Sequence, residues 1–271
     1  MPQIRVFQIF YDEKTRSMLD PGFEPFDNTT NERPDWHEYW CIRRLFLAET
    51  FADDDYVGVL SPKFREKTGL DSDYVKRCVS EAEHEVCSFS PFFDQMSLYR
   101  SSFEQGERYH PGIVEATNRF LADVGLGVDV RRFAHASNRC IFSNYFVARK
   151  SFWTRWLGLA GKLYDACEGG SRMSENMNSA TIHNGRLDKQ LKVFVMERLV
   201  SVILDRSKTD ASFHGKPESA PCADRSFSRM LPQLKECDRL KYLYSVSSEV
   251  DYLRQFVELR DSLLKWRRCA L

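Results

Sequence analysis

One carboxylate stands inside an apolar stretch of the chain. Glu197 lies in the run 193–204, in which most side chains are apolar, and Arg198 follows it directly. Burial disfavours the charged form of a carboxyl group and raises its pKa toward neutrality, which suits a general base. The alternative is that Glu197 forms an ion pair with Arg198 or with another cation at the helix surface. The position therefore predicts either a catalytic base or a structural pair.

The spacing of the other reactive side chains excludes several classes of site. The 8 cysteines include no CxxC pair and the 6 histidines no HExxH or HxxxH, so we expect reduced thiols and no sulfur-rich or histidine-based zinc site. GxGxxG, P-loop and GxSxG motifs are also absent from the sequence, which disfavours a dinucleotide enzyme, an NTPase or a serine hydrolase.

The numbers of basic and acidic residues indicate which kinds of binding partner to expect. The 39 basic and 39 acidic residues cancel, so the basic bias of a nucleic-acid-binding protein is missing and we expect no nucleic-acid partner. The charges are segregated, however: residues 1–60 are acidic, the segment 63–67 is basic and residues 229–271 are basic. This pattern still allows a small anionic ligand.

Short apolar strands alternate with helical stretches along most of the chain, a pattern typical of an α/β sheet. Asp35 could cap a helix that begins at Trp36. Residues 169–190 are polar and predict a long loop. In the last segment, 229–268, apolar residues recur at helical spacing. We expect strands at 4–10, 56–60, 85–90 and 140–148, and helices at 71–84, 113–124, 152–166, 189–204 and 229–268.

Three stretches, taken in order, resemble a known family. Residues 27–40 form a DN…NP-like loop that leads into an aromatic helix, and residues 55–65 (DYVGVLSPKFR) are similar to a DYIGL strand followed by aromatic and basic residues. Residues 142–148 (FSNYFVA) precede a Phe-Trp helix and then the Glu-Arg-Leu of 197–199. Together they resemble bacterial glycosyltransferase-like proteins of capsule and lipopolysaccharide gene clusters, related to the GT-A transferases, over residues 4–206.

The resemblance implies a domain organisation and an activity. It implies a GT-A-like domain over 1–206, with a mixed or parallel sheet flanked by helices, then a linker over 207–228 and a helical appendage over 229–271. The implied reaction moves a hexosyl or related sugar from a nucleotide-diphosphate donor to a polysaccharide or lipid-linked glycan acceptor. An inverting transferase needs a carboxylate to deprotonate the acceptor hydroxyl, and the order of the motifs assigns that role to Glu197.

The departing diphosphate needs a divalent metal or other positive charge. The resemblance implies Asp94, at the end of a strand, as a ligand of the diphosphate and of Mn²⁺ or Mg²⁺, although Phe92 stands where a second acid is expected. The triplet 53–55 has DxD spacing but precedes its strand. Lys63 and Arg65 offer a metal-free alternative at the carboxyl end of a strand, while the neighbouring Lys67 is equally typical of a solubilising loop.

Polar residues near the ends of the other expected strands complete the predicted site. Ser143 and Asn144 interrupt an apolar strand; a buried amide needs a partner, so they predict acceptor contacts or a structural bridge. The resemblance implies that the donor pocket is lined by Tyr11, Asp12, Asn28, Asn31 and Asp35.

Two other functions fit the same residues. One is a non-catalytic GT-A-like scaffold in a polysaccharide assembly complex, and the other is a hydrolase of phosphorylated sugars. The N-terminal residues enter a strand-like run without a signal-peptide layout, so we expect a cytoplasmic protein. Its C-terminal helix ends in the basic stretch 265–268, which complements the helix dipole or contacts the inner membrane peripherally.

Overall fold

A mixed six-stranded sheet forms the centre of the fold. The computed structural model describes residues 2–170, 172–183, 185–215 and 222–269. The strand order is β2-β1-β3-β5-β4-β8; β1 runs parallel to β2 and β3, β8 runs parallel to β4, and β5 is antiparallel to both its neighbours. This confirms an α/β fold with a mixed sheet. The strands are β1 (Ile4–Phe10), β2 (Glu24–Asp27), β3 (Tyr56–Leu60), β4 (Val86–Ser88), β5 (Phe146–Arg149) and β8 (Ser212–Phe213).

Successive residues of the strands face opposite sides of the sheet, as the two-residue period of a strand requires. Val57 and Val59 pack in one apolar cluster, whereas Tyr56 and Leu60 pack in another. The helices α2 (Glu38–Ala48), α8 (Lys150–Glu168) and α10 (Leu191–Ser207) cover the first side, and α3 (Phe64–Thr68) and α4 (Ser72–Ser80) cover the second. The sheet therefore has helices on both faces, and most of its strands are buried.

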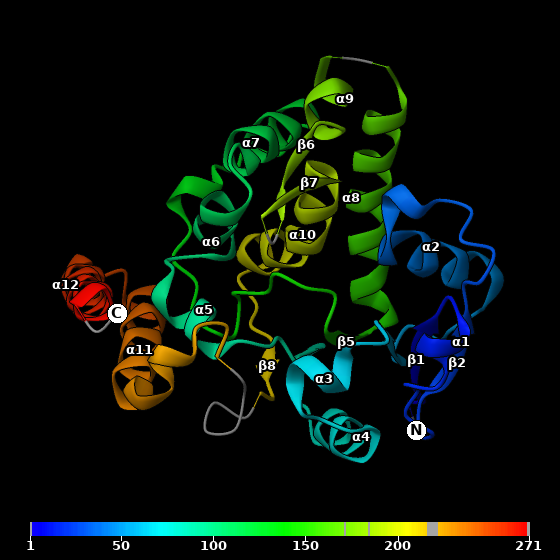
Figure 1. Cartoon of the computed structure of the whole chain (residues 1–271), viewed down its shortest axis with the longest axis horizontal. Coiled ribbons are helices and arrows are strands. Elements are labelled where there is room, and N and C mark those ends of the chain that lie inside the picture. Colours follow the sequence, from blue (N-terminus) through cyan, green and yellow to red (C-terminus); the bar gives the residue numbers. More distant parts are fainter. Residues whose placement is uncertain (1, 171, 184, 216–221, 270–271) are drawn as a thin grey trace.

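The buried Trp153 ties the long helix α8 to the sheet. Its indole Nε1 donates a hydrogen bond of 2.8 Å to the Val57 carbonyl oxygen of β3, and its ring stacks on Phe146 of β5. The predicted helix 152–166 is thus confirmed, with a start at Lys150 and an end at Glu168. Its length allows it to span the sheet and reach the helical half of the molecule (Figure 1).

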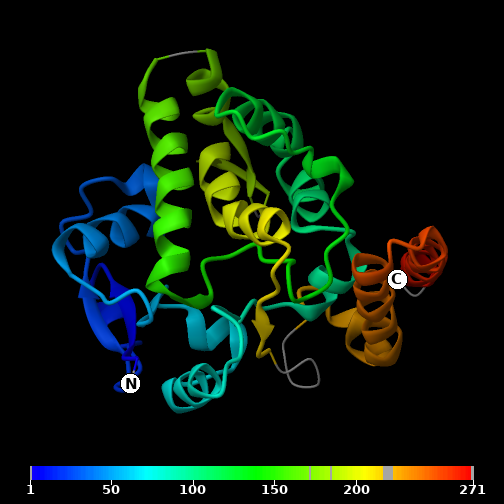
Figure 2. The ribbon, with the colours of Figure 1, turned by 180° about the vertical axis from the view of Figure 1, so that it is seen from behind.

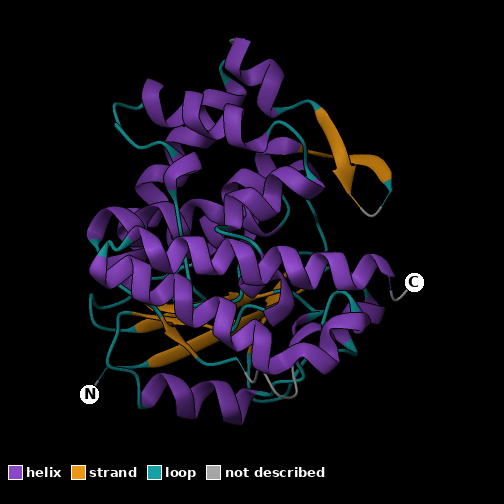
Figure 3. Cartoon of the chain, turned by 90° about the vertical axis from the view of Figure 1, so that its left-hand side faces the viewer, coloured by secondary structure: helices purple, strands orange, loops and turns teal. Residues whose placement is uncertain are grey.

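A helical half lies beyond the sheet. It contains α5 (Phe93–Leu98), α6 (Ser102–Tyr109), α7 (Ile113–Asp123) and α9 (Arg172–Met177). The hairpin of β6 (Ala180–His183) and β7 (Arg186–Gln190) stands at its edge (Figure 3). The segment 169–190, predicted as a loop, is therefore a helix and a hairpin. Gly185 has a φ of 75°, a left-handed value that favours glycine where the chain reverses between two strands.

Two further predictions on the strands were too simple. The predicted strand 140–148 pairs in the sheet only from residue 146 onward, as part of β5 (Phe146–Arg149). Residues 140–145 have no regular structure. The predicted linker 207–228 contains β8, which pairs with β4 through Cys87 and Ser88; residues 216–221 of that linker lie outside the described residues. Short irregular elements complete the chain: α1 (Glu13–Arg16) and the 3₁₀ turns at Pro34–Trp36, Val130–Arg132 and Arg225–Met230.

The C-terminal helices pack against the helical half. The predicted helical segment is two helices, α11 (Leu231–Ser247) and α12 (Val250–Cys269). They lie on the side away from the N-terminal strands in both views (Figure 1 and Figure 2). Lys241 of α11 is fully buried and donates hydrogen bonds to the carbonyl oxygens of Met96 and Tyr99. A third apolar cluster joins α11 and α12 to α5, with members that include Phe93, Met96, Phe142, Leu234, Leu240, Phe256 and Leu263.

Candidate functional site

Glu197 is the one partly exposed residue in the buried part of helix α10, from Leu191 to Leu204. Every residue of α10 from Leu191 to Leu204 is buried except Glu197, whose side chain is 21% exposed. Burial raises the pKa of Glu197 to about 7, with Arg198 opposing the rise and Glu38 adding to it. No hydrogen-bond donor within the described residues reaches its carboxylate. At neutral pH this side chain is therefore poised between its charged and neutral forms, in contact with solvent.

Arg198 acts on Glu197 through its charge, while its hydrogen-bond donors are used elsewhere. Its Nε donates to the Ser102 carbonyl (2.8 Å) and its Nη1 to the Phe194 carbonyl (2.8 Å). Its Nη2 donates to Gln105 Oε1 (2.6 Å), while the distance from Nη1 to Glu197 Oε2 is 3.8 Å. The pair that the sequence offered as an alternative thus exists at long range. The role of Arg198 is to connect α10 to α6.

Three other side chains interact with Glu197 through their charges. Tyr145 lies just before β5, and its hydroxyl is 2.7 Å from Ser61 Oγ, at the carboxyl end of β3. Burial raises the pKa of Tyr145, and the charges of Glu38 and Glu197 raise it further. Lys67 Nζ lies 5.7 Å from the centre of the Tyr145 ring, and its charge acts on the pKa of Glu197. We call Glu38, Lys67, Tyr145 and Glu197 the Glu197 site.

The Glu197 site lies where ligands bind in open α/β sheets. Ser61 follows β3 and Tyr11 follows β1, so both mark the carboxyl edge of the parallel strands. Tyr11 is 44% exposed. Burial raises its pKa, and the charges of Asp12 and Glu38 add to this rise. Of the predicted donor residues, Tyr11 is therefore one on which the charge of Glu38 acts.

The other predicted donor residues have local structural roles or face solvent. Asp12 caps α1 by accepting a hydrogen bond of 2.7 Å from the Thr15 backbone N–H. Asn28 is buried, and its Oδ1 accepts a hydrogen bond of 3.2 Å from Arg44. Asn31 is exposed and adopts a left-handed φ of 41°. These contacts hold the loop after β2 and the turn after β1; they leave the predicted roles of Asp12, Asn28 and Asn31 as predictions.

Of the basic segment after β3, Lys67 faces the Glu197 site. Lys63 and Arg65 are exposed on α3, whereas Lys67 is half-buried against the Tyr145 ring. In the helical turn 64–68, Phe64 and Thr68 are buried, Arg65 and Glu66 are exposed, and Lys67 is half-buried. Of the two roles that the sequence left open for Lys67, its contact with the Tyr145 ring favours a place at the site over a solubilising loop. Lys63 and Arg65 remain at the rim.

Asp94 does not have the environment of a metal or diphosphate ligand. It is fully buried at the start of α5, and burial raises its pKa. Its Oδ1 accepts a hydrogen bond of 2.9 Å from the Ala223 N–H and its Oδ2 one of 3.2 Å from the Asp224 N–H. Both oxygens are thus occupied in holding residues 223–224, so the placement corrects the predicted role: Asp94 cannot reach a ligand in solvent.

The acidic triplet 53–55 lies at the opposite end of β3. Asp53 forms an ion pair with Lys150 (2.7 Å) and Asp54 with Arg149 (2.8 Å). Asp55 accepts a hydrogen bond of 2.8 Å from the Gln3 N–H. Within the described residues, no three His, Cys, Asp or Glu side chains gather closely enough to hold a metal ion. The residues present do not fit the predicted Mn²⁺ or Mg²⁺ site.

The predicted acceptor residues carry unpaired oxygens. Ser143 Oγ and Asn144 Oδ1 are buried and have no hydrogen-bond partner within the described residues. Buried polar atoms normally have one, and these two precede Tyr145 directly in the chain. The structural bridge that the sequence left open is therefore not formed by these two oxygens. Contact with an acceptor remains the prediction.

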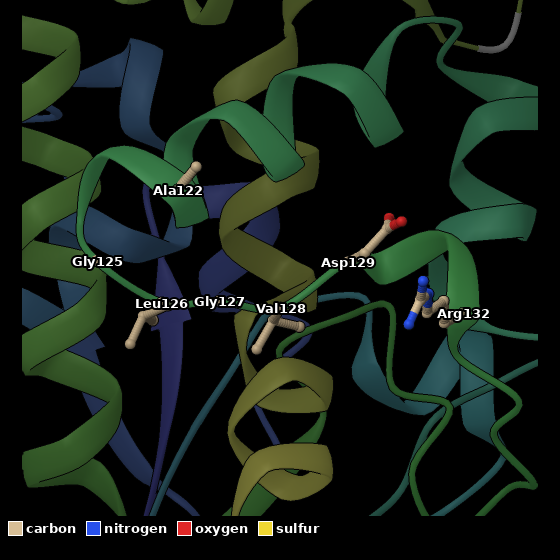
Figure 4. A pocket seen from close by; sticks show the side chains of 7 residues that line it. All are labelled: Ala122, Gly125, Leu126, Gly127, Val128, Asp129 and Arg132. Atoms are coloured by element: carbon tan, nitrogen blue, oxygen red, sulfur yellow. The ribbon is translucent and has the colours of Figure 1, made fainter.

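A shallow surface hollow lies apart from these residues in the fold. It has a volume of about 670 Å³ and follows the end of α7 (Figure 4). None of the four residues of the Glu197 site lines it. Asp129 and Arg132 are the charged side chains of its lining, and the other lining residues are apolar or glycine, so we assign no chemistry to it. The lining residues are Ala122, Gly125, Leu126, Gly127, Val128, Asp129 and Arg132.

A substitution at Glu38 should report on the electrostatics of the site. Replacing Glu38 with glutamine removes a negative charge that raises the pKa of Glu197, so the pKa of Glu197 should fall below about 7. In the wild type, the rate of any reaction that uses Glu197 as a base rises as the pH passes through this value. In Glu38→Gln this rise should move to lower pH, measured as a rate profile between pH 5 and 9. An unchanged profile would contradict the proximity of the two carboxylates.

Comparison with known protein families, with characterised proteins and with solved structures finds no match to this chain.

In the described part of the chain, no helix combines the length and the apolarity needed to cross a bilayer. The basic C-terminal stretch is partly engaged: Arg267 forms an ion pair with Asp224, while Lys265 and Trp266 are exposed. The function of the chain must therefore be argued from the Glu197 site.

Proposed function

We propose that this protein is a glycosyltransferase that moves a sugar from a nucleotide-diphosphate donor to a hydroxyl of a glycan or lipid-linked acceptor. The observation that supports this most is Glu197, a carboxylate with a pKa of about 7 at the only partly exposed position between Leu191 and Leu204. General bases work best with a pKa near the operating pH. The mixed α/β sheet is consistent with the GT-A-like domain that the sequence resembles.

In the proposed reaction, the ionised Glu197 carboxylate takes the proton of the acceptor hydroxyl. The hydroxyl oxygen forms a bond to the anomeric carbon of the donor sugar as the bond from that carbon to the diphosphate oxygen breaks. The electron pair of the broken bond leaves with the diphosphate. Lys67, on the rim of the same opening, supplies positive charge to this leaving group. We route no step through a metal ion, because Asp94 and the triplet 53–55 are engaged by other groups of the described residues.

The remaining residues of the site orient the reactants. Tyr11, at the carboxyl end of β1, offers an exposed ring on which a nucleobase can stack. Ser143 and Asn144 carry the predicted acceptor contacts, a role for which their buried, unpaired oxygens must become accessible when the acceptor binds. Tyr145 is held by Ser61 at 2.7 Å, and Lys67 lies against its ring.

A nucleotide screen tests the proposal. We expect one of uridine, guanosine, cytidine or thymidine diphosphate to raise the melting temperature in the presence of EDTA. Saturation at a hundredfold excess over Kd corresponds to about 2.7 kcal/mol. Lys67→Gln should lose most of this shift. The matched control is Lys63→Gln, an exposed lysine of the same segment, which should keep it.

The same experiment separates the competing functions. No response to any nucleotide, with or without Mn²⁺, would favour the non-catalytic scaffold. Nucleotide-sugar turnover that yields free sugar in the presence of acceptor would favour the hydrolase. Equal losses in Lys67→Gln and Lys63→Gln would show that charge in general, and not the position of Lys67, binds the nucleotide.

A further inference from the structure

The buried guanidinium of Arg198 lies against one face of α6. Its Nε donates a hydrogen bond of 2.8 Å to the Ser102 carbonyl oxygen, and its Nη2 donates one of 2.6 Å to Gln105 Oε1. Gly106 leaves the space that the guanidinium fills, because a Cβ at this position would lie 2.9 Å from Nε and 3.3 Å from Cζ of Arg198. We call Ser102, Gln105 and Gly106 the α6 cradle.

Gly106 is a costly residue at its position in the chain. It lies inside α6, where glycine is less favourable than alanine by about 1 kcal/mol. Its backbone does not adopt the left-handed conformation that would require glycine. The atoms that a Cβ would meet belong to the side chains of Arg198 and Ile113. The physical reason for a glycine here is therefore the placement of the guanidinium.

A chain of buried amides orients Gln105 toward Arg198. Gln105 Nε2 donates to Gln95 Oε1 at 3.5 Å, and Gln95 Nε2 donates to Asp94 Oδ2 at 3.0 Å. Gln105, Gln95 and Asp94 are all buried. Because the amide nitrogen of Gln105 is used in this chain, its oxygen is the end that accepts from the guanidinium. Asp94, whose predicted role as a metal ligand the structure corrects, thus anchors the chain that ends at Arg198.

The α6 cradle keeps Arg198 from its neighbouring carboxylate. Arg198 Nη1 donates to the Phe194 carbonyl oxygen at 2.8 Å and lies 3.8 Å from Glu197 Oε2, beyond hydrogen-bond distance. The charges that act on Arg198 come from Glu197 and Cys140, and burial raises the pKa of the Cys140 thiol to about 11, so this thiol is neutral at pH 7. A guanidinium released from the cradle would therefore have Glu197 as its charged partner.

We propose that Gln105 and Gly106 are positioning residues, which hold the guanidinium of Arg198 out of hydrogen-bond contact with Glu197 so that the carboxylate stays free to take a proton. An arginine in direct contact stabilises the ionised form of a carboxyl group and makes it a weaker base. The inference deepens the proposed function and rests on it for the role of Glu197 as the base. The placement of Arg198 itself does not depend on that function.

The other groups around this pair come from four further segments. The charges of Glu38 on α2 and Lys67 on α3 act on Glu197. Burial raises the pKa of Tyr145, just before β5. Burial lowers the pKa of His110, which follows α6, to about 4, and the charge of Arg198 adds to this effect. Tyr145 and His110 are therefore neutral at pH 7, and the tests below leave all four side chains unchanged.

Titration of Glu197 in Gly106→Ala tests the cradle without any substrate. Protein labelled with ¹³C at the glutamate side-chain carboxyl is followed by nuclear magnetic resonance from pH 4 to 9, and the signal of Glu197 is the one missing in Glu197→Gln. The pKa of about 7 in the wild type should fall by about 1–3 in Gly106→Ala, as for a carboxyl group beside an arginine. The matched control is Gly158→Ala in α8, where a Cβ meets no atom within 4 Å; it should keep the wild-type value.

Substitutions of Gln105 test the same contact without a change at Gly106, should Gly106→Ala fail to fold. Gln105→Met removes the acceptor of Arg198 Nη2 at nearly constant size, so the pKa of Glu197 should fall as in Gly106→Ala. Gln105→Glu restores an acceptor and adds negative charge, so the pKa of Glu197 should stay at the wild-type value or rise above it. Circular dichroism melting curves confirm that each variant compared is folded.

The outcomes separate the cradle from the proposed function. An unchanged pKa of Glu197 in both Gly106→Ala and Gln105→Met, or an equal fall in Gly158→Ala or Gln105→Glu, overturns the inference. A lowered pKa in a protein that transfers no sugar would keep the cradle and refute the proposed function. Where transfer occurs, the rise of its rate with pH should move to lower pH in Gly106→Ala by the same amount as the pKa of Glu197.

Discussion

Replacing Glu197 with glutamine is expected to lower the rate of sugar transfer by about 10²- to 10⁴-fold, the usual contribution of a positioned general base. The amide has nearly the same size and cannot take a proton from the acceptor. The carboxylate is already surrounded by protein, with 21% of the side chain exposed, so the substitution should not disturb α10. Nucleotide binding, measured by melting-temperature shift, should stay close to that of the wild type.

Glu66→Gln is the matched control for this experiment. Glu66 is an exposed acid on α3 whose charge also acts on Tyr145, so its removal changes the local charge without removing the base. Its transfer rate should remain within about twofold of the wild type, as for most surface substitutions. Near-normal turnover in Glu197→Gln would show that another group accepts the proton and would refute the assignment.

Removing residues 229–271 is expected to abolish the cooperative folding of the remaining chain. The sequence predicts this segment as an appendage, but its helices share an apolar cluster with α5. Without α11, the carbonyl oxygens of Met96 and Tyr99 lose the buried Lys241 ammonium as a donor. Unpaired buried groups and exposed apolar surface both destabilise the fold. Circular dichroism melting and gel filtration of residues 1–228 would measure the loss.

Point variants show whether the interface or the mere length of the chain matters. Leu240→Ala, at a buried position of α11, should lower stability by about 2–5 kcal/mol. Val246→Ser, at a position that is 60% exposed, should change it by about 0.5 kcal/mol or less. If residues 1–228 melted cooperatively at the temperature of the full chain, the C-terminal helices would be the separate appendage that the sequence predicts.

The elements that could be predicted from the sequence are those whose pattern is local. β1 and β3 are short runs of β-branched and aromatic residues, and α8 and α10 are long stretches rich in apolar residues at helical spacing. Both helices contain no proline, and α8 continues through Gly158 and Gly161. Glu197 belongs to this group as well. A carboxylate in an apolar helix has a raised pKa wherever that helix is buried, so its chemistry follows from its immediate neighbours in the chain.

The elements that the sequence did not reveal depend on partners from elsewhere. β8 is two residues long, and only its pairing with β4 makes it a strand. The segment 140–145 is as apolar as a strand, yet the Ile141 N–H bonds to Ser201 of α10 and not to a neighbouring strand. Asp94 follows β4, where the resemblance implied a ligand, but the amides of residues 223–224 donate hydrogen bonds to its carboxylate.

The surroundings of Glu197 were decided by the tertiary structure. Lys67 could be a surface lysine by sequence, and Glu38 carries no local signal. The strand order brings the ends of β1 and β3 together, and the charges of Glu38 and Lys67, which come from separate segments, act on one carboxylate. The sequence alone determined which residue could act as a base. Which charges tune it depends on distances between segments, since electrostatic interactions act through space and not along the chain.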